Sequence, residues 1–497
     1  MNISTHNCLA QTTDLLTDPR WGDEDFLFFN DDPQSGPPDN WDVLKDVDTG
    51  RAMRESYKSM VGDNPYTATG RRKVPVGFIM YVDACVTGQY QNLNIEIFKF
   101  TLSLLNNEAR EKDYGWRNLG YVPNRVKGKG KAEELLRAAK HIDAKKYLED
   151  PRYRAFMAPQ SEEHAPNFGG HGGIIDEEDD GNPPDMPEVK AQDLHVMLDA
   201  ILSSYGVIED TGIEWDKLYH NKVHRLLLLP FILFLKVDGV EADKVTGQYL
   251  TKSGNVSSLC RSCVCPTDQS DEPYRTYQRK SQSLIQKLVA NGDTTRLKQI
   301  SQQHIWNAFY QFRFGSHNDH GIHGACPMEA LHWICINSFG YTRSNFFEQC
   351  GPTSGLADTI NTTAIAMGTL LKRQSDRDMP PTQFAKSVQE GKVMAHEMAG
   401  VLLVLLMTIR STRGRQALLT ETRGRSKLLF PDKTYVRDWI ALLETQLQFE
   451  RWMNLPEIRV NLVHRAGTKF REMMNMNRRI AKRESGMGFK PTCRRTC

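Results

Sequence analysis

Hydrophobic positions mark two similar segments, 76–83 and 231–238, each a run of mostly apolar residues that ends in Val-Asp. β-Branched and aromatic side chains are common in both runs, and a small residue follows each one. Short apolar runs of this composition are typical of buried β-strands. We therefore predict two core strands that end in Asp83 and Asp238, at the rim of a sheet where ligands are commonly held.

The same pattern predicts the other elements of an α/β core with a mainly helical C-terminal half. Apolar runs at 95–105 and 116–123 follow the first strand after short links that contain Gly or Asn, which favours an antiparallel meander. A strand pair is expected around 222–238. Helical periodicity is found at 131–150, 191–206, 273–291, 297–312, 326–339, 357–374, 390–413 and 433–452.

Shifts in composition divide the chain into five predicted parts. One of them, the strand-rich core at 75–258, contains the two aspartates and is expected to include a mobile, Gly/Pro-rich acidic loop at 157–190. The parts are an acidic, loop-rich N-terminal arm (1–74), the core (75–258), a Cys/His-rich insertion (259–325), a helical region that completes the core (326–452) and a basic C-terminal tail (453–497).

Composition and charge narrow the class of protein. The 497 residues are 39% hydrophobic and 25% charged, which is ordinary for a soluble protein of two or three domains. No segment reaches the roughly 18–20 apolar residues of a membrane span, and the acidic N-terminus lacks the apolar stretch of a secretory signal. We expect no membrane partner, a nuclear or cytoplasmic location and reduced cysteines.

The net charge of +2 conceals a strong asymmetry along the chain. Residues 1–50 contain eleven acidic side chains and two basic ones, whereas residues 465–497 contain ten Lys or Arg and two acidic side chains. A basic segment of this density suits contacts with phosphate groups. A solvated tail without a ligand is the alternative.

The paired aspartates predict a metal site if their strands are neighbours. Two carboxylates about 4 Å apart repel each other by about 4 kcal/mol at an effective dielectric constant near 20. A divalent cation bound by oxygen ligands compensates this repulsion, so Asp83 and Asp238 indicate a site for a hard metal. The alternative is that each aspartate caps the turn that follows it.

A cysteine motif follows the second aspartate. Cys260 and Cys263 form a Cys-x-x-Cys pair, with Cys265 beside it, and such a pair supplies half of a tetrahedral zinc site. No second Cys-x-x-Cys exists, so histidine must complete the site. The candidates cluster within sixteen residues beside Cys326: His317, His320, His323 and His332. A redox dithiol and packed core cysteines are the alternatives.

Two glutamates are candidates for further acids. Glu329 and His332 share one face of a helix predicted to start near Pro327, where a solvated glutamate and a packing histidine would also fit. Cys326 and His332 lack a third orienting group, which argues against a nucleophilic pair. Glu397 precedes an apolar, buried helix and is either an acid of the site or a surface residue of the first turn.

Several sequence blocks occur in a known combination. They read DVDTGRAMRESY, VPVGFIMYVDACVTGQYQNLNIEIFKFTLSLLN and WRNLGYVPN, followed by VDGVEADKVTGQYL, LCRSCVCPTD, HGIHGACPMEALHW and HEMAGVLLVLLM. In this order they resemble the transposase core of Plavaka-like elements, which are related to the CACTA and Kyakuja–Dileera–Zisupton groups of eukaryotic DNA transposons. The resemblance spans residues 40–415.

This resemblance implies a ribonuclease-H-like mixed sheet with three catalytic acids and a zinc-bearing, mainly helical insertion between the second acid and the third. Asp83 would be the acid on the first core strand and Asp238 the acid after the fourth. Glu329 or Glu397 would be the third acid. CACTA-type proteins carry a further glutamate where this chain has Ile334, which is a departure from the pattern.

The resemblance also implies a metal content and an activity. Cys260 and Cys263, with Cys265 less secure and His332 a further candidate, would bind a structural Zn²⁺. The three acids would bind two Mg²⁺ ions that support DNA cleavage and strand transfer. Partners would be transposon ends and target DNA, the location nuclear (or cytoplasmic for a fragment), and the active form a homo-oligomer.

The N-terminal arm qualifies this expectation. The N-terminal arm is acidic and has Cys8 as its one cysteine, so no segment is recognisable as a module for element ends. A catalytically inactive, domesticated or truncated derivative that serves as a zinc-binding nuclear DNA- or protein-binding module is therefore the alternative function. A zinc hydrolase would need an open coordination position and a general base, and neither can be named.

Overall fold

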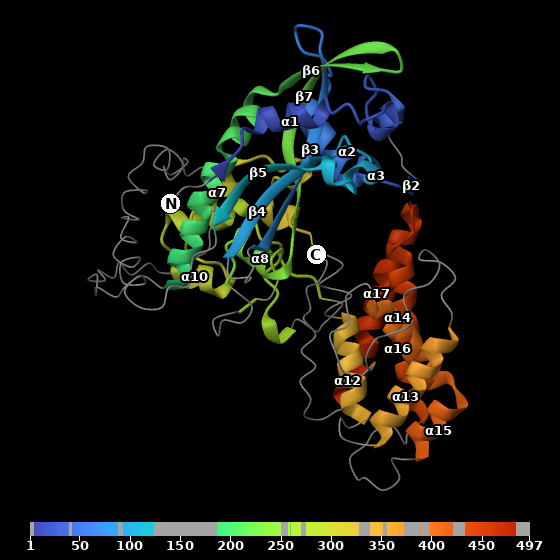
Figure 1. Cartoon of the computed structure of the whole chain (residues 1–497). Coiled ribbons are helices and arrows are strands. Elements are labelled where there is room, and N and C mark those ends of the chain that lie inside the picture. The colour runs from blue at the N-terminus through green and yellow to red at the C-terminus, as the bar shows by residue number, and fades with distance from the viewer. Residues whose placement is uncertain are drawn as a thin grey trace, which may run out of the picture.

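The structure of the chain is a computed structural model (Figure 1). It describes residues 4–38, 42–87, 93–123, 186–249, 257–258, 260–269, 275–327, 338–350, 355–371, 388, 397–420 and 433–483. Its strands are β1 (Ser4–Thr5), β2 (Val43–Leu44), β3 (Arg72–Thr87), β4 (Leu93–Leu102), β5 (Arg117–Pro123), β6 (Ile213–Tyr219), β7 (Lys222–Val237) and β8 (Ile458–Arg459).

The described helices are distributed unevenly along the chain. The N-terminal half contains α1 (Cys8–Leu16), α2 (Arg51–Val61), α3 (Asn107–Arg110), α7 (Met186–Thr211) and α8 (Gly239–Val245). The C-terminal half contains α9 (Gln282–Ala290), α10 (Thr294–Gln299), α11 (Ile322–Ala325), α12 (Gly340–Cys350), α13 (Gly355–Leu370), α14 (Met398–Arg410), α15 (Thr412–Thr420), α16 (Lys433–Met453) and α17 (Val460–Arg483).

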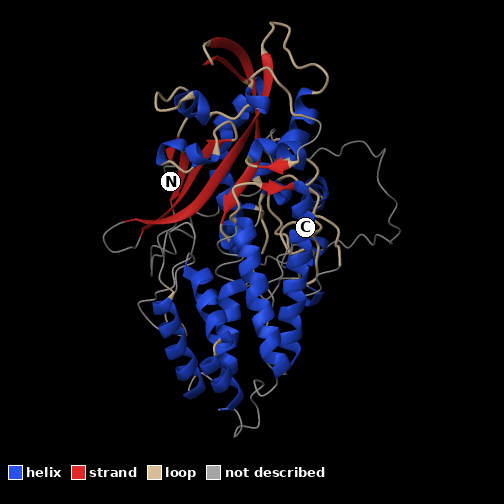
Figure 2. Ribbon diagram, turned by 90° about the vertical axis from the view of Figure 1, so that its right-hand side faces the viewer, coloured by secondary structure: helices blue, strands red, loops and turns tan. Residues whose placement is uncertain are grey.

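A mixed sheet forms the centre of the N-terminal half. Its strand order is β1-β5-β4-β3-β7-β6. Strands β3, β4 and β5 are antiparallel neighbours, which confirms the predicted meander. Strand β7 lies parallel to β3 on its other side, and β6 forms an antiparallel hairpin with β7 (Figures 1 and 2). The predicted mixed α/β architecture is confirmed.

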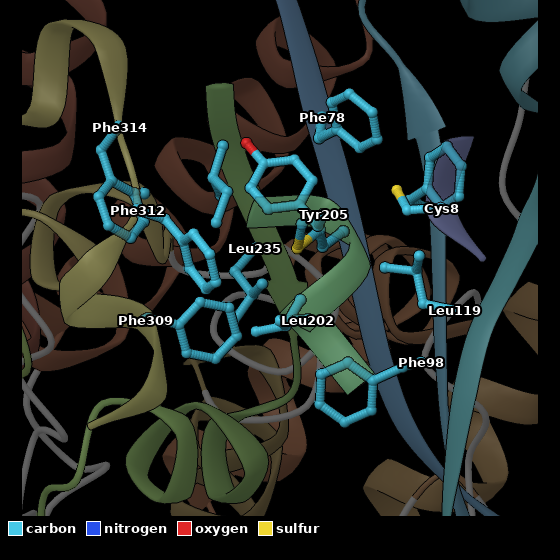
Figure 3. Packing of buried hydrophobic residues seen from close by; sticks show 14 of the residues in the cluster. Cys8, Phe78, Phe98, Leu119, Leu202, Tyr205, Leu235, Phe309, Phe312 and Phe314 are labelled. Carbon is cyan, nitrogen blue, oxygen red and sulfur yellow. The ribbon is translucent and has the colours of Figure 1, made fainter. Parts of the chain in front are cut away.

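Side chains alternate along β3, so that one face of the sheet contributes to the hydrophobic core. Val76, Phe78, Met80 and Val82 are buried, and successive residues of a strand point to opposite faces. On this face the side chains pack against helix α7. Figure 3 shows Tyr205 of α7 beside Phe78, with ring centroids 5.0 Å apart. Burial of this apolar surface is the main term that stabilises the layer.

The N-terminal arm is part of this core. Cys8 at the start of α1 is fully buried in the same cluster as Phe78, as Figure 3 shows. The arm also contributes α2, whose Met53 packs with Phe231 and Leu233 of β7 on the opposite face of the sheet. Residues 1–74, expected to be loop-rich, therefore contain two helices that cover the two faces.

A second hydrophobic core forms in the C-terminal half, where helices α12–α17 pack together (Figure 2). Its fully buried residues include Trp439, whose ring lies against Phe346 with centroids 5.2 Å apart. Helix α17 packs along α16. The segment 453–497, expected to be a basic tail, therefore includes a 24-residue helix because apolar side chains such as Met473 and Ile480 recur on one face of it.

A short link connects the two halves. Strand β2 of the arm pairs with β8, which immediately precedes α17. The ammonium of Lys45 lies 2.7 Å from the carboxylate of Glu457. On the other side, the Asp46 carboxylate accepts a hydrogen bond from Asn107 N–H and pairs with Arg110, both beside the sheet. The arm therefore fastens the helical half to the sheet.

Two predicted boundaries differ from the structure. Strand β3 continues to Thr87, so Asp83 lies within the strand rather than at its end, because β4 pairs with β3 as far as Thr87. The periodic segment 297–312 forms only the end of α10 and a single 3₁₀ turn, since Ser301 takes a left-handed φ of 55°. The predicted helix 131–150 and most of the loop 157–190 lie outside the described residues.

Within the described ranges, no helix combines the length and the hydrophobicity needed to cross a bilayer.

Candidate functional site

The parallel pairing of β3 and β7 places the two predicted aspartates beside each other. The last registered pair of these strands is Val82 with Val237, and Asp83 and Asp238 are the next residues along each strand. Val82 and Val237 both belong to the core that contains α7. Because side chains alternate along a strand, the two aspartates belong to the opposite face of the sheet.

Asp238 also caps the helix that follows it. Its Oδ1 accepts hydrogen bonds from Val240 N–H at 2.8 Å and Glu241 N–H at 2.7 Å, at the start of α8. These contacts match the capping interpretation left open for this residue. Both bonds use Oδ1, so the cap fixes the orientation of the carboxylate.

Asp83 is held in a different way. It is half-buried in the middle of the extended β3–β4 pair, opposite Ile97. The hydroxyl of Tyr81, two residues earlier on the same face, donates a hydrogen bond of 2.6 Å to its Oδ2. Asp83 precedes no turn, so the capping interpretation does not apply to it. A neutral donor orients this carboxylate without neutralising its charge.

Further carboxylates, which the pattern of apolar runs did not single out, lie at the same end of the sheet. Glu96 of β4 and Glu241 of α8 are buried, and the ammonium of Lys244 lies 3.2 Å and 2.7 Å from them. Burial, followed by the charge of Glu96, raises the pKa of Glu241 above its ordinary value. The spacing of Glu241 and Lys244, three residues apart in α8, was the available signal for this pair.

The third acid is not located by the described residues. Glu329 and His332 lie outside them, in the segment 328–337. Glu397 directly precedes α14, whose side chains pack in the second core. Across the part of the chain that the structure describes, no three His, Cys, Asp or Glu side chains are grouped as a metal site.

The three cysteines of the predicted zinc motif do come together. Cys260, Cys263 and Cys265 form one small buried cluster, with Tyr277 packed against it. Their loop is held by backbone hydrogen bonds from Val264 N–H to Gln278 and from Lys280 N–H to Ser262, of 3.0 and 2.9 Å. The insertion therefore begins as a tight loop that folds back on the chain leading into α9.

Buried cations surround this cysteine cluster. Lys280 is almost fully buried and donates a 2.9 Å hydrogen bond to Gln248. Burial lowers its pKa to about 8, against the opposing charges of Cys260 and Asp243. The buried guanidinium of Arg261 lies 3.1 Å from the Asp243 carboxylate. Such cations fit an environment in which the cysteines carry negative charge.

His323, one of the predicted histidines, lies at this cluster. It is fully buried, with its Nε2 3.3 Å from the Tyr310 hydroxyl, and its ring also interacts with the backbone of Arg261, which lies between the first two cysteines. Burial, with a smaller contribution from Lys280, lowers its pKa to about 3. The imidazole is therefore neutral at physiological pH, which is the form that binds metals.

Comparison with known proteins adds no relative: no protein-family model matches this chain, and no curated protein matches it either.

Proposed function

We propose that the chain is a transposon-derived enzyme of the DDE type, with a ribonuclease-H-like core, that cleaves and joins DNA strands. The observation that carries this proposal is the adjacent placement of Asp83 and Asp238 on the parallel strands β3 and β7. The order of three antiparallel strands, a helix and a strand parallel to the first also fits such a core. Strand β6 would be an addition to it.

The carboxylates of this site fit hard divalent cations. Asp83 and Asp238 present oxygen ligands on one face of the sheet, and a third ligand from Glu329 or Glu397 would complete the set. Two bound Mg²⁺ ions would lower the pKa of an attacking water or 3′-hydroxyl and neutralise charge on the transferring phosphate. The chain itself supplies orientation: Tyr81 fixes Asp83, and the start of α8 fixes Asp238.

A structural zinc is the second metal of the proposal. Cys260, Cys263 and Cys265 supply thiolates from one buried cluster, and the fourth ligand would be His323 or His332. The position of His323 beside Arg261 and the charge of Lys280 near Cys260 and Cys263 support this set. Zinc would stabilise the loop that leads from the second acid into the helical half.

A nicking assay with DNA and Mg²⁺ tests the proposal. We expect Asp83→Asn and Asp238→Asn to reduce the rate at least about a hundredfold, since each removes a metal ligand. Asp293→Asn is the matched control, because Asp293 also caps a helix, α10, through its Oδ1. Asparagine is also a good N-cap residue, so both variants should retain their helix caps. A loss of activity in Asp238→Asn would therefore not reflect unfolding of α8. Activity that survives both site variants would overturn the assignment.

A non-catalytic zinc-binding nuclear module, which binds DNA or protein, is the second candidate. It is favoured by one observation: Glu397, the candidate third acid that the structure describes, directly precedes α14, which packs in the second core rather than on the sheet. Calorimetric titration separates the candidates. Two Mg²⁺ or Mn²⁺ ions per chain support the enzyme, whereas zinc alone supports the binding module.

A further inference from the structure

A row of basic and aromatic side chains crosses the sheet next to the proposed acids. Lys99 of β4 is registered opposite Tyr81 of β3, and Lys236 of β7 lies beside Tyr81 on the other side. Tyr81 is two residues before Asp83 and therefore lies on the same face of the sheet. Lys99 and Lys236 are paired with Tyr81 and share this face. The row is one step behind the acids, about 6.6 Å along the strands.

Trp116 closes the row at the β5 side. The ammonium of Lys99 lies 4.6 Å from the ring centroid of Tyr81 and 5.2 Å from that of Trp116. The two rings meet edge to face with centroids 6.1 Å apart, and the indole N–H of Trp116 donates to the Arg110 carbonyl. The aromatic rings are therefore fixed, and the cation is held between them.

The lysines of this row differ from other cations near the site. Neither Lys99 nor Lys236 forms an ion pair with any residue that the structure describes, whereas Lys244 on the opposite face is paired with two carboxylates. Lys236 is exposed, and Lys99, Tyr81 and Trp116 are half-exposed. Unpaired cations beside rigid rings, next to clustered carboxylates, favour an anionic ligand with aromatic parts.

The covering helices leave this region of the sheet accessible. Helices α1 and α7 pack on the core face. Helix α2 lies on the same face as the row, in a cluster with Phe231 and Leu233 that extends to Ile79 and Phe234, the residues that precede Tyr81 and Lys236 on this face. The row itself is open to solvent, since Lys236 is exposed and Tyr81, Lys99 and Trp116 are half-exposed. Strands β3, β4 and β5 run side by side in Figure 1.

We propose that Lys99, Tyr81, Lys236 and Trp116, here called the lysine–aromatic row, bind single-stranded DNA and guide it to Asp83 and Asp238. Proteins that bind single strands combine cations for the phosphates with aromatic rings on which bases stack. The identity of the ligand as DNA rests on the proposed function. The row would hold the strand through its backbone and base faces, without reading its sequence.

Binding of a labelled single-stranded oligonucleotide to the full chain, measured by fluorescence anisotropy without divalent ions, tests the row. We expect Lys99→Ala and Lys236→Ala each to weaken binding about five- to tenfold and to lower the slope of log K against log salt by about 0.7. Trp116→Leu should weaken binding at least about fivefold through lost stacking, with little change in that slope. Lys222→Ala, at the exposed start of β7, is the control and should change neither quantity.

Conservative variants separate ligand contact from altered folding. Lys99→Arg keeps the charge and should keep the affinity, and Tyr81→Phe keeps the ring but removes the hydrogen bond to Asp83. We expect Tyr81→Phe to bind normally and to slow nicking. Variants of the row that bind with the affinity and salt slope of Lys222→Ala would overturn the inference. An RNA strand bound more tightly than DNA would overturn the ligand assignment.

Failure of the inference is distinguishable from failure of the proposed function. If the row variants lose binding while no Mg²⁺-dependent nicking is found, the row is supported as a DNA-binding site and the enzymatic proposal is contradicted. If the intact chain nicks DNA and the row variants match it in affinity and nicking rate, the inference about the row is contradicted and the enzymatic proposal is supported.

Discussion

Single buried side chains make parts of this protein sensitive to pH. Glu209 near the end of α7 is 5% exposed, and its Oε1 accepts hydrogen bonds from the Tyr205 hydroxyl at 3.1 Å and from Arg313 N–H at 2.8 Å. Burial raises its pKa from 4.5 to about 7, although these hydrogen bonds oppose the shift. The folded state therefore favours the protonated carboxyl group.

This shift fixes the sign of a pH dependence. Between pH 4.5 and about 7 the folded state binds more protons at Glu209 than the unfolded state does, so its contribution to stability is complete below pH 4.5 and falls as the pH rises towards 7. Glu209→Gln keeps the acceptor oxygen and removes the titration. As the pH rises from 4.5 to 8, we expect the free energy of unfolding of the variant to increase by about 3 kcal/mol relative to that of the wild type, measured by urea unfolding. Glu108→Gln, at an exposed position, is the control, and equal pH profiles for Glu209→Gln and wild type would contradict the prediction.

At the level of single residues, the sequence predicted the parts of the candidate site that lie in continuous motifs. The Val-Asp endings singled out Asp83 and Asp238, and the Cys-x-x-Cys spacing singled out the cluster that includes Cys260. The sequence could not indicate that Tyr81 donates to Asp83 or that Lys99 lies over Tyr81. These contacts depend on the register between strands, and a shift of one residue would place the side chains on the opposite face.

At the level of elements, a bulge in β7 explains a glycine in β3. The register shifts between Phe78 and Ile79, so Leu233 is an extra residue in β7. A Cβ added at Gly77 would lie 2.7 Å from the Leu233 Cβ, which is too close for two carbon atoms. Gly77 also exchanges hydrogen bonds of 2.8 Å with Ser103, through its N–H and its carbonyl. The glycine is therefore required by the approach of the bulge.

Replacement of this glycine should be costly. We expect Gly77→Ala to destabilise the protein by about 2–3 kcal/mol, since the neighbouring atom belongs to a rigid part of a buried side chain. Gly467→Ala is the matched control, because Gly467 lies in α17 with no atom near its would-be Cβ. That variant should be stabilised by about 0.5–1 kcal/mol through helix propensity. Guanidinium unfolding measures both, and a neutral Gly77→Ala would exclude the proposed contact.

Elements with a strong local pattern were predictable, and those set by tertiary contacts were not. The meander, α7, α13 and α16 followed the periodicity of apolar residues, and their boundaries shifted by several residues at most at the described ends. The prediction of a helix at 297–312 was wrong because a left-handed turn at Ser301 interrupts this segment. Helix α17 was missed because its many charges resembled a solvated tail, while the partner that buries its apolar face is α16.

At the level of the whole molecule, two separate cores meet through a small link. The sheet and α7 bury one cluster around Phe78, and α12–α17 bury another around Trp439. The described contacts that join them include the two-residue pairing of β2 with β8 and the ion pair of Lys45 with Glu457. Because a link of this size transmits little stabilisation, each core should unfold on its own.

Two truncations test this independence. Phe78 is fully buried, with its ring centroid 4.9 Å from that of Phe100, and Trp439 is 1% exposed. Phe78→Ala and Trp439→Ala should each remove about 3–5 kcal/mol from the core that contains them. In scanning calorimetry we expect two transitions, of which each variant lowers a different one, since distant sites without shared partners act additively. A single transition that both variants lower together would show instead that the β2–β8 link couples the two cores into one cooperative unit.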